Sequence, residues 1–218
     1  ALSSVAGAAE TLLSVTRALL LVNADHGSAW NARKLLVADG LFEGSSIPQE
    51  IKLLNLIFTK HAKSPNAWAH RRWCWRKNDK VDSSIDNRER SRARHKGSTW
   101  QPLDVEQELK VCQRVAELYP KNYYAWTQRS WVVLRVVGSA SARADVGAGG
   151  EDAPNNCRSM AAQLLQQEIS FVDKWMTSHV SDHSALNHRK NVVSALAAVS
   201  AASDETARLS LLEKERSA

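Results

Sequence analysis

The 218-residue chain has only three cysteines, and their spacing fits neither a disulfide framework nor a cysteine zinc site. Cys74, Cys112 and Cys157 are odd in number, and no Cys-x-x-Cys pair occurs. Cysteine used in this way is typical of proteins in a reducing compartment. We therefore expect a cytoplasmic protein without structural disulfides.

The sequence also lacks a run of about 18 apolar residues, so we expect no membrane span. Residues 1–22 are rich in alanine, leucine and serine, as some targeting peptides are. They have no basic segment at their start, they contain Glu10, and their apolar residues recur at helical spacing. This pattern favours a first helix over a targeting peptide.

Familiar catalytic motifs are missing as well. The chain has no Gly-rich phosphate loop, no His-Glu-x-x-His and no nucleophile elbow. His70 and His188 are single histidines without neighbouring Cys or acidic residues in the sequence, so packing or hydrogen-bonding roles are favoured over metal ligation. We expect no catalytic residue, no metal and no cofactor in this chain.

The formal charge of +6 is concentrated in one segment. Residues 76–96 contain eight Lys or Arg against four acidic residues. The segment has no interleaved aromatic residues, which disfavours single-stranded nucleic acid as a partner. A solvated loop is the favoured interpretation. A docking segment for an acidic protein, lipid head groups or RNA is the alternative.

Helical periodicity dominates the rest of the chain, and no segment alternates with period two for long enough to form a strand. We predict an all-α, single domain over 1–218, with flexible insertions at 78–101 and 138–157. The predicted helices cover 1–22, 29–39, 49–62, a segment from 65, a segment from 102, a segment from 123, 158–178 and 184–202, and a ninth begins at the N-cap Asp204.

A short motif occurs four times in this pattern. An alanine precedes a large apolar residue, and arginine follows three positions later. The anchors and arginines are Trp30 and Arg33, Trp68 and Arg71, Trp126 and Arg129, and Leu186 and Arg189. The anchors are 38, 58 and 60 residues apart, and removing about twenty residues for each long loop leaves a spacing typical of stacked helix pairs. We expect the tryptophans to wedge between pairs, and the arginines to stack on the indoles and reach carbonyls of the adjoining pair.

The third copy extends this motif. Residues 122–129, Asn-Tyr-Tyr-Ala-Trp-Thr-Gln-Arg, match every defined position of Asn-Tyr-x-x-Trp-x-x-Arg. This is the repeat of protein prenyltransferase α-subunits, which the chain resembles over most of its length. The second copy has Ser64-Pro65 in place of Asn-Tyr, and the fourth has Leu186 in place of Trp. The resemblance implies a right-handed superhelix (α-solenoid) of antiparallel helix pairs, with about four repeats plus a terminal helix.

The resemblance also implies a function. The chain would be the α-type, non-zinc subunit of a heterodimeric protein geranylgeranyltransferase. Its partner would be a β-subunit of the Rab geranylgeranyltransferase type, which would hold the zinc. The substrates would be an isoprenoid diphosphate and the C-terminal cysteine of a vesicle-trafficking acceptor, SNARE or Rab-like. The alternative is a non-catalytic helical-repeat scaffold that binds a protein partner.

Two lysines stand five residues before their tryptophans, at expected helix starts. The helix dipole disfavours a cation at a helix N-terminus, so it disfavours Lys63 and Lys121. Lysine together with the free backbone N–H groups of such a terminus is, however, well suited to binding phosphate. By resemblance, Lys63 contacts the diphosphate, and Lys121, Asn122, Tyr123 and Tyr124 belong to the same substrate site. Either lysine could instead be an ordinary solvated residue.

Overall fold

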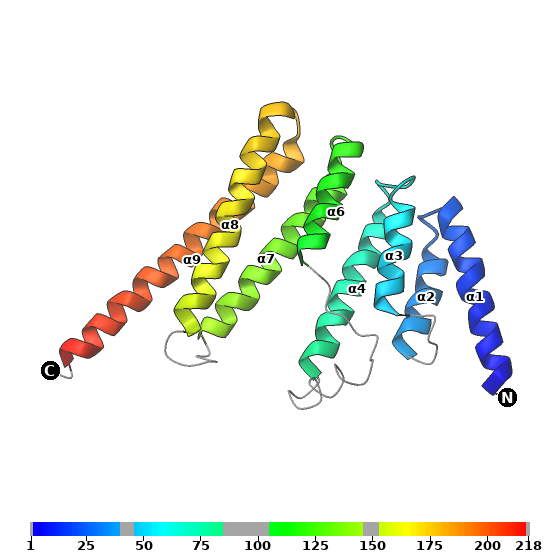
Figure 1. The fold of residues 1–218 in the computed structure, drawn as a ribbon, viewed down its shortest axis with the longest axis horizontal. Coiled ribbons are helices and arrows are strands. Elements are labelled where there is room, and N and C mark those ends of the chain that lie inside the picture. Colours follow the sequence, from blue (N-terminus) through cyan, green and yellow to red (C-terminus); the bar gives the residue numbers. More distant parts are fainter. Residues whose placement is uncertain (1, 40–45, 85–104, 146–152, 217–218) are drawn as a thin grey trace. The chain divides into compact units, whose positions relative to one another are not determined.

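The computed structural model describes residues 2–39, 46–84, 105–145 and 153–216 (Figure 1). All regular elements in these ranges are α-helices, which confirms the all-α prediction and fits a helical-repeat solenoid. The helices are α1 (Leu2–Val22), α2 (Gly27–Asp39), α3 (Ile47–Ile57), α4 (Pro65–Ser84), α6 (Val105–Leu118), α7 (Tyr123–Asp145), α8 (Ala153–Ser178) and α9 (His183–Arg216).

The chain forms two compact units, Ala1–Val115 and Ala116–Ala218. In the first unit α1 packs on α2 and α3 on α4, and the two pairs stack because α1 also contacts α3 and α2 also contacts α4. In the second unit α7, α8 and α9 all contact one another. The predicted single array over 1–218 depends on how these units join, so it stays a prediction.

Each second helix of a pair begins at a polar side chain four residues before its anchor. In each case this side chain accepts a hydrogen bond from the backbone N–H of the repeat alanine, as an N-cap does. The pairs are Ala29 N to His26 Nδ1 at 3.2 Å, Ala67 N to Ser64 Oγ at 3.1 Å, Ala125 N to Asn122 Oδ1 at 3.2 Å and Ala185 N to Asp182 Oδ1 at 3.3 Å. One cap position is therefore filled by four residue types, and the four alanines beside it are buried.

Two helices extend into the predicted insertions, and these boundaries were wrong. α4 continues to Ser84, and α7 continues to Asp145, so residues 78–84 and 138–145 are helical. α8 already begins at Ala153. Alanine and arginine after Gly138 favour a helix enough to offset the cost of one glycine, about 1 kcal/mol. The remaining parts of the insertions, and the predicted helix start at Pro102, lie outside the described residues.

The predicted ninth helix was also wrong. α9 is unbroken from His183 to Arg216, so Asp204 lies inside it and is not an N-cap. Small, alanine-rich segments carry no stop signal of their own, and an acceptor such as Asp can sit within a helix at modest cost. α3 ends at Ile57, earlier than the predicted residue 62.

The repeat tryptophans are buried, and two of them contact rings of the next helix pair, as predicted. The Trp30 ring stacks on His70, and the Trp126 ring meets Trp175 edge-on. Trp30 and Trp68 are buried, and each indole Nε1–H donates to the carbonyl six residues earlier: to Ala24 at 2.7 Å and to Ala62 at 2.8 Å. Each of these indoles is thus hydrogen-bonded to the turn that precedes its own helix. Within the ranges that the structure describes, no helix is both long and apolar enough to cross a membrane.

Candidate functional site

The repeat arginines form buried ion pairs with glutamates on the first helix of the next pair. The distances are 2.7 Å from Arg33 Nη2 to Glu50 Oε1, 2.6 Å from Arg71 Nη2 to Glu108 Oε2 and 2.7 Å from Arg129 Nη2 to Glu168 Oε1. We call these six residues the Arg–Glu ladder. The glutamates lie on α3, α6 and α8, so each pair joins consecutive helix pairs.

The ladder corrects the predicted role of the arginines. Arg33 does reach a carbonyl, that of Leu13 at 3.0 Å, but its main partner is the Glu50 carboxylate. The aromatic ring under the Arg129 guanidinium is Phe171, 4.0 Å away, and not the repeat indole. The planar guanidinium thus serves mainly as a two-pronged donor to carboxylate.

Two of the glutamates are shared with histidines. His70 Nε2 lies 2.9 Å from Glu50 Oε2, and His188 Nε2 lies 3.0 Å from Glu168 Oε2. Each histidine stands directly before the repeat arginine of its own helix. The predicted hydrogen-bonding role of both histidines is confirmed.

Burial and hydrogen bonding act in opposite directions on Glu50. Burial alone would raise its pKa, but the hydrogen bonds from His70 and Arg33 and the Arg33 charge outweigh it, so the pKa lies below its usual value. Glu168 has a lowered pKa by the same balance, with His188 and Arg129 as donors. Both carboxylates are therefore ionised at neutral pH.

His70 is neutral in this arrangement. Burial lowers its pKa below the usual value, and the Glu50 hydrogen bond offsets this only in part. His70 Nδ1 is buried with no hydrogen-bond partner, so a second proton on the ring would be a buried donor without an acceptor. The proton is assigned to Nε2, which donates to Glu50.

We expect the thermal midpoint of the chain to fall in two stages on acidification. A lowered pKa means that the unfolded chain binds more protons, so stability decreases as pH falls through that window. The His70 stage begins near its ordinary pKa of 6.5, and the Glu50 and Glu168 stage begins near 4.5. Calorimetry between pH 8 and 3 measures both. In His70→Gln the first stage should shrink, and an unchanged profile would contradict this assignment.

Sequence reasoning missed the three glutamates, although a signal existed. Glu50, Glu108 and Glu168 each stand 18 residues before the anchor of their own repeat, at Trp68, Trp126 and Leu186. Constant spacing across copies whose loops differ in length indicates a position held by packing.

The predicted site residues 121–124 lie together at the start of α7. Lys121 is exposed and adopts φ 58°, the left-handed region that disfavours residues with a Cβ. Asn122 is fully buried, because its side chain caps α7. Tyr123 is 61 % exposed, and the Tyr124 ring meets it edge-on at 5.5 Å. Lys121 and Tyr123 are thus the members that present themselves to solvent.

Tyr123 also borders a pocket between the starts of α7 and α9, with a cavity volume of about 240 Å³. Its lining comprises Tyr123, Trp126, Thr127 and Ser130 from α7, and His183, Ser184 and Asn187 from α9. Trp126 Nε1 donates to Asp182 Oδ2 at 2.9 Å, and Asp182 caps α9, so the two helix starts are held together. The pocket offers hydroxyl, amide and imidazole groups beside an aromatic wall.

Lys63 occupies the equivalent place in the first unit. It is exposed in the turn between α3 and α4, next to Ser64, whose Oγ donates to Asp25 Oδ1 at 2.6 Å. This bond joins the turn to the preceding pair. Lys63 belongs to the first unit and Lys121 to the second, so a shared site for them stays a prediction.

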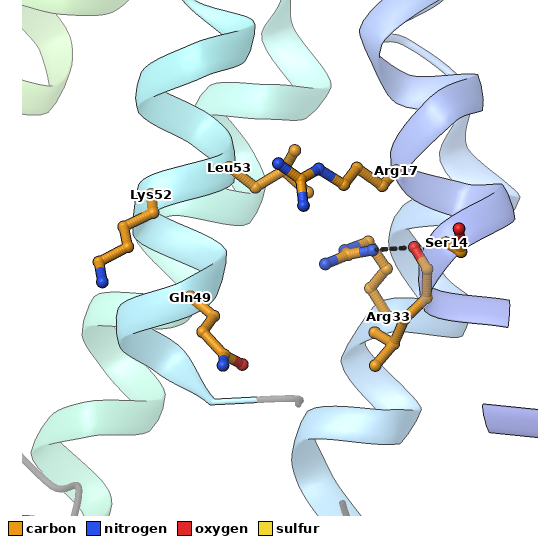
Figure 2. A pocket seen from close by; sticks show the side chains of 7 residues that line it. Ser14, Arg17, Arg33, Gln49, Lys52 and Leu53 are labelled. Atoms are coloured by element: carbon orange, nitrogen blue, oxygen red, sulfur yellow. Dashed lines mark hydrogen bonds between the residues drawn. The ribbon is translucent and has the colours of Figure 1, made fainter. Parts of the chain in front are cut away.

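A cationic cleft between α1 and α3 was not anticipated (Figure 2). Its volume is about 400 Å³, and its lining comprises Leu13, Ser14, Arg17, Arg33, Gln49, Lys52 and Leu53. Glu50 neutralises Arg33, whereas Arg17 and Lys52 have no ion partner within the described part of the chain. Two cations with nearby hydroxyl and amide groups suit an anionic group.

The remaining reactive groups do not form a centre. Cys74 and Cys112 are buried thiols, and burial raises the pKa of the Cys74 thiol well above its usual value. No group of three or more His, Cys, Asp or Glu able to hold a metal ion occurs within residues 2–39, 46–84, 105–145 and 153–216.

Comparison with known proteins agrees with this repeat geometry. Residues 47–78, 105–136 and 165–196 match the model of the protein prenyltransferase alpha subunit repeat. These segments fall on α3 with α4, α6 with α7, and α8 with α9. The α1–α2 pair lies outside the matched segments, yet its Arg33 makes the same link to the next pair.

Curated relatives carry the name protein prenyltransferase alpha subunit repeat-containing protein 1. The chain is 32 % identical to that of Danio rerio over 190 residues and 31 % identical to that of Homo sapiens over 193 residues. These alignments cover 86 % of the chain but 39 % and 40 % of the relatives, so the chain spans about two fifths of their length. Three matched repeats, and a fourth of the same geometry, establish that the chain belongs to the protein prenyltransferase α-subunit repeat family.

Proposed function

We propose that the chain is part of an α-type, non-zinc subunit of a heterodimeric protein geranylgeranyltransferase, of the third type. In this role it helps to position an isoprenoid diphosphate and the C-terminal cysteine of a SNARE or Rab-like acceptor in the cytoplasm. The β-subunit of the Rab geranylgeranyltransferase type would hold the zinc. The observation that carries the proposal is the conformation of Lys121.

Lys121 is unfavourable for folding in two ways. A left-handed residue with a Cβ costs about 1–2 kcal/mol, and a cation before the first turn of a helix opposes the helix dipole. Glycine or asparagine would meet the backbone requirement at lower cost. A bound diphosphate reverses the electrostatic cost, because the ammonium and the helix N-terminus then face an anion.

The neighbouring groups complete the proposed substrate surface. The hydroxyl of exposed Tyr123 can donate to a phosphate oxygen or to the acceptor peptide. In the transfer, the acceptor thiolate attacks C1 of the isoprenoid, a thioether forms and diphosphate leaves. Zinc in the partner would lower the thiol pKa, and Lys121 would stabilise the charge that develops on the leaving diphosphate.

Co-expression with the Rab-type β-subunit tests this function. We expect a complex that co-elutes on gel filtration and transfers labelled geranylgeranyl to an acceptor ending in cysteine. The matched control is the same acceptor with serine in place of that cysteine, and labelled farnesyl diphosphate tests the donor. A failure both to form the complex and to transfer lipid would reject the proposal.

A scaffold without catalytic function is the second candidate. The motif residues Asn122, Trp126 and Arg129 are buried, and their contacts are a cap, an indole hydrogen bond and the Arg–Glu ladder. Each of these contacts stabilises the fold. A stable β-subunit complex that neither retains labelled isoprenoid diphosphate nor transfers it would favour the scaffold.

A further inference from the structure

The last repeat leaves exposed a face that every other repeat buries. Trp30, Trp68 and Trp126 are 2–3 % exposed, whereas Leu186, at the same position of α9, is 50 % exposed. These anchors occupy equivalent places four residues after their N-caps. The difference therefore arises from what lies next to each helix and not from its register.

Two further positions on the same face behave in this way. The repeat arginine side chains are 6 % exposed at Arg33, 1 % at Arg71 and 6 % at Arg129, but 40 % at Arg189. Seven residues after the anchor, Val37, Trp75 and Val133 are 8 %, 5 % and 0 % exposed, but Val193 is 39 % exposed. Leu186, Arg189 and Val193 are spaced i, i+3 and i+7, so they form one stripe, which we call the α9 stripe.

The arginine of the α9 stripe has a substitute partner. Arg189 Nε donates to Asp173 Oδ1 on α8 at 2.6 Å, and the Asp173 side chain is 50 % exposed. A solvent-exposed pair of this kind contributes little to stability, about 0–1 kcal/mol. Arg189 is therefore available to a better-placed carboxylate at small cost.

The two ends of the Arg–Glu ladder differ. In the first repeat, the position 18 residues before the anchor is Leu12, and the position before the arginine is Ala32. In the other repeats, the residue 18 positions before the anchor is Glu, and the residue before the arginine is His or Gln. α1 therefore lacks the carboxylate that receives an arginine, whereas α9 keeps the arginine that needs one.

We propose that the α9 stripe is a docking surface for the first helix of a further repeat, an amphipathic helix with glutamate in the centre of its apolar face. Leu186 and Val193 would be covered by apolar side chains, and Arg189 would exchange Asp173 for the incoming glutamate. Charge complementarity and register both specify this occupant. The curated relatives have length for such a helix, because the match covers 38–40 % of each. A second copy is a poorer occupant, because its α1 presents Leu12. This inference is independent of prenyl transfer.

A helix-stabilised peptide of residues 158–178, which carries Glu168, is the probe. Fluorescence anisotropy with the 218-residue chain should show saturable binding. Glu168→Gln in the peptide and Arg189→Gln in the chain should each weaken binding about tenfold, because a buried charge loses its partner. Arg189→Glu in the chain with Glu168→Arg in the peptide should restore part of the affinity.

Control variants distinguish peptide binding at the α9 stripe from a change in net charge or in folding. Arg17→Gln removes the same charge from α1 and should leave binding unchanged, and Val193→Asp should abolish it while circular dichroism stays that of the parent chain. Absence of saturable binding, or binding indifferent to Arg189→Gln and Val193→Asp, would overturn the proposal. So would sedimentation that shows a dimer of the chain dissociated by Arg189→Gln, since the occupant would then be a second copy.

Discussion

Glu50→Ala is expected to lower the free energy of unfolding of the first unit by about 3–5 kcal/mol, the usual cost of breaking a buried ion pair from one side. Arg33 and His70 both use this carboxylate, and their side chains are 6 % and 0 % exposed. Without Glu50 the Arg33 charge stays buried and loses its main partner. Urea unfolding followed by circular dichroism and tryptophan fluorescence measures the loss. Trp30 is a useful reporter, because its ring stacks on His70 with the centroids 4.3 Å apart.

Two variants define the origin of this effect. Asp173→Ala breaks the exposed pair with Arg189 and should cost less than about 1 kcal/mol. Arg33→Met with Glu50→Leu removes both charges and should recover only part of the loss. An apolar pair needs no desolvation, but buried His70 still loses its acceptor. A cost below about 1 kcal/mol for Glu50→Ala would show that water or a rearranged side chain replaces the carboxylate.

Lys121→Gly is expected to lower kcat/KM for isoprenoid transfer by the β-subunit complex about 10- to 100-fold. This corresponds to one charge-assisted contact of about 1.5–3 kcal/mol with the diphosphate. Stability should stay within about 1 kcal/mol of the parent, because glycine adopts the left-handed conformation of Lys121 without steric strain. Steady-state transfer and urea unfolding on the same preparations measure both quantities.

Matched variants distinguish charge from structure. Lys121→Arg keeps the cation and should retain most of the transfer. Lys174→Ala removes an exposed lysine from α8 in the same unit and should have no effect. If Lys121→Gly transferred lipid as well as the parent complex, the left-handed lysine would have no role in the reaction. If it failed to assemble, Lys121 would belong to the subunit interface.

Local interactions explain which parts of the fold could be predicted. The N-cap, the alanine and the tryptophan lie within four residues of one another, so the start of each second helix is recognisable wherever it occurs. Helix ends were harder to predict. Gly138 and Asp204 resemble stop signals but lie inside α7 and α9, because single residues change helix stability by only about 1 kcal/mol.

The residues of the candidate site fall into the same two groups, those that a local motif predicts and those that only tertiary packing selects. The sequence alone determined the family, the repeat anchors and the exposed Lys121 and Tyr123, since these follow from a short contiguous motif. Only the tertiary structure decided which group each arginine binds. Arg33 finds Glu50 17 residues later, and Arg71 finds Glu108 37 residues later. The separation of arginine from glutamate varies with loop length, so spacing does not reveal the pairs, although the constant 18 residues from each glutamate to its own anchor marks the glutamate position. Stacking of one helix pair on the next selects them, and the exposed α9 stripe is the surface where that stacking has no partner in the described chain.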